Sequence, residues 1–311
     1  MDPSPIKLLM SPIRQFLLSL LCTMPLVAPV AGAEDLRFSS GSGQTVLIEL
    51  FTSEGCNSCP PAEAYLNQIT GSPLLWKKFI PVAFHVDYWD YLGWKDRYAH
   101  PAHTQRQHQY AQQRSVRSVY TPAFIVNGQG WRPSLSSGDP GGGGTPAGVL
   151  TVDLKGNQLE VTFKPENAVS KTLQLNLAVL GMGLSTRIQN GENAGRQSPH
   201  EFVMLALKQM SSDSGRWRAV VPATEQDRTA QRLALVAWVN QPGDLTPLQA
   251  TGGYLPESAT RVGKERQASP EQVRNCHVDR REKSDNAMMT PDFHAGRFLA
   301  ALDMTTYSEL P

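Results

Sequence analysis

Residues 45–61 read TVLIELFTSEGCNSCPP, and this stretch decides the first interpretation of the fold. Its β-branched and apolar run, 45–51, is typical of a buried strand. A short turn then leads to Cys56 and Cys59, and two prolines follow where a helix tolerates proline, in its first turn. Apolar residues recur at helical spacing to about residue 70, and 80–86 (IPVAFHV) indicates a second buried strand. Strand, helix and strand in this order predict a βαβ unit with parallel strands.

The position of the two cysteines predicts redox chemistry. At a helix start the helix dipole and free backbone N–H groups stabilise a thiolate, which is the attacking species in disulfide exchange. A second thiol two residues further on can resolve the mixed disulfide. We therefore expect Cys56 to be the nucleophile and Cys59 the resolving thiol. No redox cofactor is required, because electrons move by thiol exchange.

An aromatic loop and a proline are the other candidate parts of this site. Thr121 and Pro122 open a third strand, and in folds of this kind a cis-proline loop faces the dithiol. Tyr88 and Trp89 belong to an aromatic cluster that either lines a substrate groove beside the dithiol or caps the core of the domain. The polar stretch 102–114 predicts a helix, whose histidines and glutamines we expect on a solvated face.

Beyond residue 148 the pattern changes to short apolar or alternating runs separated by turns, which is typical of a β-sandwich. The prediction is an α/β thioredoxin-like N-terminal domain over 34–132, then a Gly/Pro linker over 133–148. An all-β sandwich-like domain over 149–255 and a poorly ordered tail over 256–311 follow. The closing strand and helix of a thioredoxin fold are hard to find. The first domain is therefore either truncated or completes its sheet with the second half.

The N-terminus predicts export. Lys7 and Arg14 precede an apolar run over 16–30, and the small residues 31–33 follow it, so residues 1–33 have the order of a cleaved secretory signal peptide. The apolar run is short for a membrane span, although an uncleaved anchor is the competing interpretation. We expect a periplasmic or secreted protein with no membrane contact beyond this segment. The formal net charge of +1 gives no reason to expect nucleic-acid binding.

Four motifs resemble a known family. They are 48–63 (IELFTSEGCNSCPPAE), 85–96 (HVDYWDYLGWKD), 118–122 (SVYTP) and 191–196 (GENAGR). Together they resemble a secreted, thioredoxin-like family of bacteria, domain of unknown function 1223. The resemblance covers roughly 45–254 and implies a thioredoxin-like fold with redox chemistry. It implies no substrate.

The leading functional prediction is an exported thiol–disulfide oxidoreductase that acts on protein or small-molecule thiols and disulfides, with an unknown partner that recycles it. One alternative is a copper- or zinc-handling protein that uses Cys56, Cys59 and His85, because thiolate and imidazole ligands suit both metals. The other is a non-catalytic binding module in which the disulfide is only structural. Cys276 would remain unpaired in the mature chain.

Overall fold

The computed structural model describes residues 35–132, 143–223 and 229–256. The predicted signal peptide, most of the predicted linker and the predicted tail lie outside these residues. The described part of the chain is mostly β, with fourteen strands and two α-helices, α2 (Pro60–Gln68) and α3 (Pro101–Gln112). Two short 3-10 turns, Ile69–Gly71 and Asp90–Leu92, also lie in the described part. No described helix is long and apolar enough to cross a membrane.

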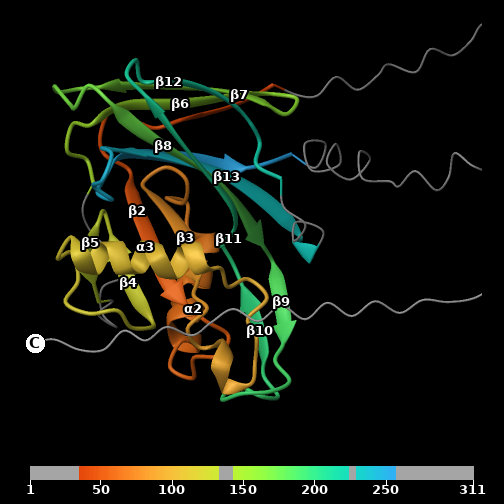
Figure 1. Cartoon of the computed structure of the whole chain (residues 1–311). Helices are drawn as coiled ribbons and strands as arrows, with labels where there is room; N and C mark the ends of the chain where they lie inside the picture. The colour runs from red at the N-terminus through yellow and green to blue at the C-terminus, as the bar shows by residue number, and fades with distance from the viewer. Residues whose placement is uncertain (1–34, 133–142, 224–228, 257–311) are drawn as a thin grey trace, which may run out of the picture. The chain divides into compact units, whose positions relative to one another are not determined.

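An eight-stranded sheet carries the candidate site (Figure 1). In spatial order its strands are β14 (Pro247–Tyr254), β13 (Arg232–Asn240), β8 (Leu173–Met182), β11 (Val203–Ser212), β3 (Phe79–His85), β2 (Val46–Thr52), β4 (Ala123–Val126) and β5 (Gln129–Trp131). Strands β2 and β3 are parallel and joined through α2, so the βαβ unit predicted from the sequence is confirmed.

The predicted fold class is wrong, because the chain does not form an α/β thioredoxin-like N-terminal domain followed by a β-domain. Only two α-helices occur among the described residues, and the fourteen strands there belong to three sheets. The edge of β3 is paired with β11, where Val203 lies beside Ala83. The first half therefore completes its sheet with strands from the second half. Local patterns of hydrophobicity could not predict this pairing, because its partners are far apart in the sequence.

A second, four-stranded sheet packs on the first and makes the fold sandwich-like, as predicted. Its order is β1 (Leu36–Ser39), β6 (Gly148–Lys155), β7 (Gln158–Pro165) and β12 (Arg216–Val220). Leu235 and Ala237 of β13 pack in the core shared with this sheet, whereas Val236 and Trp238 pack in the core under α2 and α3. Because β13 is buried on both faces, its sequence is continuously apolar instead of alternating.

Helix α3 corrects another expectation, because one of its polar faces is buried. His103, Arg106, Gln107 and Tyr110 recur at helical spacing and are all buried. The guanidinium of Arg106 donates to Glu49 of β2 at 2.7 Å, and its carbon lies 5.4 Å from the ring centroid of Trp238. Arg106 therefore joins the helix to β2 through a buried ion pair and to β13 through a cation–π contact.

Candidate active site

Cys56 and Cys59 form a disulfide at the start of α2. Cys59 is the N-cap residue, and the amides of Ala62 and Glu63 donate to its carbonyl oxygen. The first two helical residues are prolines, which have no N–H to offer a thiolate, so the expected stabilisation by free backbone N–H groups is reduced at this helix start. Cys56 is 1% exposed and Cys59 0%, beneath a turn whose residues 57 and 58 are exposed.

The predicted substrate residues lie together beside this turn. Trp89 packs against Gly55, where an added Cβ would lie 3.1 Å from the Cβ of Trp89, so a larger residue would require Trp89 to shift by a few tenths of an ångström. The indole N–H of Trp89 donates to the Thr121 hydroxyl at 2.7 Å, and the peptide bond from Thr121 to Pro122 is cis. The Tyr88 hydroxyl donates to Gln107 at 3.2 Å. Trp89 thus connects the dithiol turn to the proline loop.

The loop at 191–196 also reaches the dithiol turn, which the sequence did not predict. The side-chain amide of Asn193 donates to the carbonyl oxygens of Glu54 and Cys56, both at 2.9 Å. Gly191 has a φ of 76° and packs close to Trp94. A segment of the second half therefore holds the backbone on both sides of Gly55.

A buried cluster of acidic and histidine side chains includes Glu54 and Glu63, which flank the two cysteines in the sequence. The two ring nitrogens of His200 donate to Glu63, at 2.7 Å, and to Glu54, at 3.1 Å. His85 donates from Nδ1 to Asp96 at 2.7 Å, and the rings of His85 and His200 lie 5.2 Å apart. The cluster joins α2, the end of β3, the aromatic loop and the end of β10 (Gln197–His200), which pairs with β9 (Leu184–Arg187).

The pKa values of the cluster favour its charged form. Burial alone would lower the pKa of His200, but hydrogen bonds to Glu54 and Glu63 raise it to about 10. Burial would raise the pKa of Glu63 and of Asp96, yet in each case the histidine partner and further hydrogen bonds together outweigh it and the pKa is lowered. The charge of Asp96 likewise raises the pKa of His85 against its burial. At neutral pH, His200 is therefore an imidazolium between carboxylates.

His103 behaves in the opposite way. It is buried on α3 and donates from Nδ1 to the carbonyl oxygen of His85 at 2.8 Å. With no carboxylate as a hydrogen-bond partner, burial lowers its pKa to about 4. His103 is therefore neutral at pH 7 and contrasts with His200.

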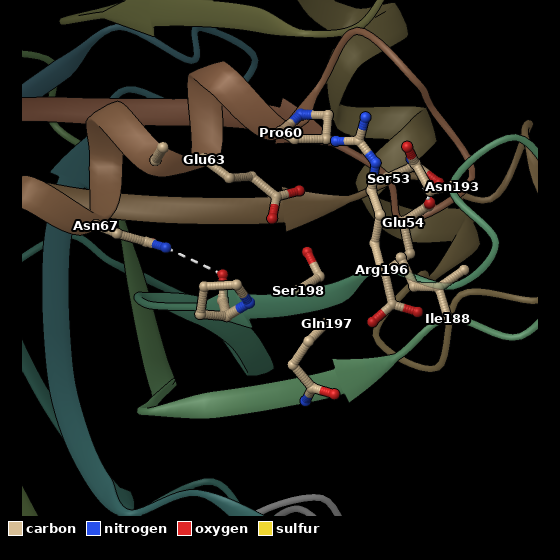
Figure 2. A pocket seen from close by; sticks show the side chains of 12 residues that line it. Ser53, Glu54, Pro60, Glu63, Asn67, Ile188, Asn193, Arg196, Gln197 and Ser198 are labelled. Atoms are coloured by element: carbon tan, nitrogen blue, oxygen red, sulfur yellow. Dashed lines mark hydrogen bonds between the residues drawn. The ribbon is translucent and has the colours of Figure 1, made fainter.

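A pocket of about 330 Å³ lies between α2 and β10 (Figure 2). Figure 2 shows Glu63 pointing into it from α2, with Ser198 and Gln197 on the facing strand. Glu54 and Asn193 line its other end. The pocket therefore reaches the carboxylates that hold His200.

In the structure, His85 does not group with the two cysteines as a set of metal ligands. Among the described residues, the histidines, cysteines and acids close enough to share a cation are Glu63, His85 and His200. The predicted copper or zinc set of Cys56, Cys59 and His85 is therefore not brought together. His200, Glu63 and Asp96 did not emerge from the sequence, because no local spacing connects them.

Comparison with known proteins identifies the family. A family described as a protein of unknown function, DUF1223, matches residues 47–240. The chain belongs to this family. The DUF1223 region includes the disulfide, the proline loop, the buried cluster and the loop at 191–196.

Two solved structures are similar to this DUF1223 protein at low sequence identity. A crystal structure of a protein from Agrobacterium tumefaciens is 21% identical, covers 67% of this chain and 92% of its own, and gives a TM-score of 0.47. HBP35 of Porphyromonas gingivalis is 16% identical, covers 70% of this chain and 76% of its own, and gives a TM-score of 0.45. No curated protein matches the chain.

Proposed function

We propose that this protein is an exported thiol–disulfide oxidoreductase of the periplasm or the extracellular space, with Cys56 as the reactive sulfur and Cys59 as the resolving one. The observation that carries the proposal is the Cys56–Cys59 disulfide at the N-terminus of α2. Its position beside an exposed turn also supports it, because an exchangeable disulfide must be reached by a partner thiol.

The exchange is balanced without a cofactor. A substrate thiolate attacks Sγ of Cys56, the Cys56–Cys59 bond breaks, and Cys59 leaves as a thiolate. A second substrate thiolate attacks the sulfur of the first in the mixed disulfide and releases Cys56. Two substrate thiols thus become one disulfide, and the protein gains two electrons and two protons. The reverse sequence reduces a substrate disulfide.

Trp89, Tyr88, Thr121 and Pro122 are the proposed substrate surface. All four are partly exposed, and Trp89 contacts both the dithiol turn and Thr121. Tyr88 and Trp89 also pack against the hydrophobic core, so the two roles considered for the aromatic cluster are compatible. A protein segment or a small thiol lying on Trp89 would approach Cys56 from the exposed side of the turn.

Trapping of a mixed disulfide tests the proposal. In Cys59→Ser the Cys56 thiol has no resolving partner, so glutathione disulfide is expected to give a stable adduct of one glutathione per chain, measured by mass spectrometry. In Cys56→Ser only Cys59 remains, which the proposal assigns as the resolving thiol, and we expect it to react at least about tenfold more slowly. Both variants should carry Cys22→Ser and Cys276→Ser, so that no other thiol can form a glutathione adduct.

Two results would contradict the assignment. Equal reaction rates in the two variants would show that Cys56 has no special role. Reaction of either thiol only after the chain unfolds in urea would mark the bond as structural, and the binding-module alternative would then lead.

A further inference from the structure

Three buried side chains from three separate elements converge within the acidic and histidine cluster. Glu63 comes from α2, His85 ends β3 and His200 ends β10. Each offers one nitrogen or oxygen ligand atom, and the three atoms all lie within 4.8 Å of one another. We propose that Glu63, His85 and His200 form a binding site for a divalent first-row transition metal ion, for which Zn²⁺ is the best-fitting probe.

The chemistry of the donor set supports this site. Two imidazoles and one carboxylate are a ligand set that zinc and non-haem iron use when further coordination positions stay open. Ligands bound to zinc at about 2.1 Å in a tetrahedron lie about 3.4 Å apart. The separations within the cluster thus allow a metal after small side-chain shifts.

The surroundings of the two histidines provide the outer hydrogen bonds that such ligands need. Metal-bound histidines almost always donate their second ring N–H to a carboxylate or a carbonyl group, which fixes the orientation of the ring. His85 is held in this way by Asp96, through Nδ1, and this leaves Nε2 for a metal. Glu54 holds His200 through Nε2, and this leaves Nδ1, which faces Glu63.

Metal and proton would compete for His200. In the metal-free molecule its Nδ1–H donates to Glu63, and a cation would replace this hydrogen bond by two coordinate bonds. The loss of the proton is therefore a cost that the bonds to the metal must exceed, and binding is best measured slightly above neutral pH.

An entry path to the cluster exists. The pocket of about 330 Å³ between α2 and β10 is lined by Glu54, Glu63 and Arg196, so a hydrated cation would pass the Arg196 side chain to reach the two carboxylates from this side (Figure 2). Asn193 lines the same pocket, and its buried side-chain carbonyl oxygen has no hydrogen-bond partner among the described residues. This oxygen can accept a hydrogen bond from a water on the incoming ion.

Zinc titration of the metal-free full chain tests the site. The chain should carry Cys22→Ser and Cys276→Ser, keep the Cys56–Cys59 disulfide oxidised, and be titrated with ZnCl₂ in a calorimeter at pH 8. We expect one Zn²⁺ per chain with a Kd of about 1 µM or tighter. His85→Gln and His200→Gln should each weaken binding at least tenfold. His103→Gln alters a buried histidine outside the cluster and should bind as the parent does.

X-ray absorption of the zinc-loaded parent keeps the proposal testable if these variants do not fold. We expect only nitrogen and oxygen neighbours, at about 2.0–2.2 Å. A Cys56→Ser/Cys59→Ser variant should retain the zinc affinity of the parent. The metal site is therefore tested independently of the proposed oxidoreductase activity. The proposal is overturned by any of three results. These are no binding at about 100 µM Zn²⁺, a sulfur neighbour at about 2.3 Å, or full affinity in both folded histidine variants.

Discussion

Replacing Arg106 by methionine is expected to lower the free energy of unfolding by about 3–5 kcal/mol, the usual cost of leaving one partner of a buried ion pair alone. Glu49 is fully buried in β2, and the Arg106 guanidinium and the Tyr110 hydroxyl both donate to its carboxylate. Methionine fills much of the arginine volume but donates no hydrogen bond. The measurement is urea unfolding at pH 7, followed by circular dichroism.

Two controls separate this effect from a general loss of packing. Arg218→Met makes the same substitution in the exposed pair with Glu160, whose side chains are 87% and 64% exposed, and should cost less than about 1 kcal/mol. Adding Glu49→Gln to Arg106→Met removes the uncompensated charge and should recover part of the stability. If Arg106→Met costs no more than Arg218→Met, the buried pair does not anchor α3 to the sheet.

Stability should fall steeply as the pH rises above neutrality. The pKa of His200 is raised to about 10 in the folded chain, against an ordinary value of 6.5. A raised pKa contributes stability that is fully present below about pH 6.5 and is lost as the pH approaches 10. The difference corresponds to about 4–5 kcal/mol, a large share of the stability of a typical domain. Urea unfolding between pH 6 and 10, with EDTA present to keep metal off the cluster, measures it.

Variants of two buried histidines show where the effect arises. His200→Gln leaves Glu54 and Glu63 without their cation and should be less stable at pH 7 by several kcal/mol. Its free energy of unfolding should then change much less between pH 7 and 10 than that of the parent. His103→Gln should lose as much stability between pH 7 and 10 as the parent does, because the pKa of His103 is lowered to about 4 and it does not titrate in this range. If His200→Gln lost as much stability between pH 7 and 10 as the parent does, the pH dependence would not arise from His200.

Much of the strand content could be predicted from hydrophobic runs, because each strand leaves a local signal. The strands expected at 45–51 and 80–86 correspond to β2 and β3. The fold class could not be predicted in the same way. The pairing of β11 with β3 is non-local, and it turns two apparent domains into one shared sheet.

The candidate site likewise contains residues that could be predicted from the sequence and residues that could not. Cys56 and Cys59, with Trp89 and Thr121, were found because their chemistry is visible in short motifs. His200 and Asn193 were missed because they come from the second half and reach the disulfide only through the fold. The buried face of α3 was missed because its residues are polar, and polar residues at helical spacing ordinarily indicate a solvated surface.

A redox titration of the Cys56–Cys59 pair tests the central claim most directly. The chain with Cys22→Ser and Cys276→Ser would be equilibrated in glutathione buffers, and its free thiols counted with an alkylating mass tag. An exchangeable site predicts a reversible two-electron transition between about −270 and −120 mV, which Cys56→Ser abolishes. A disulfide that stays oxidised below about −300 mV would contradict the proposed oxidoreductase, because a bond of that stability is structural.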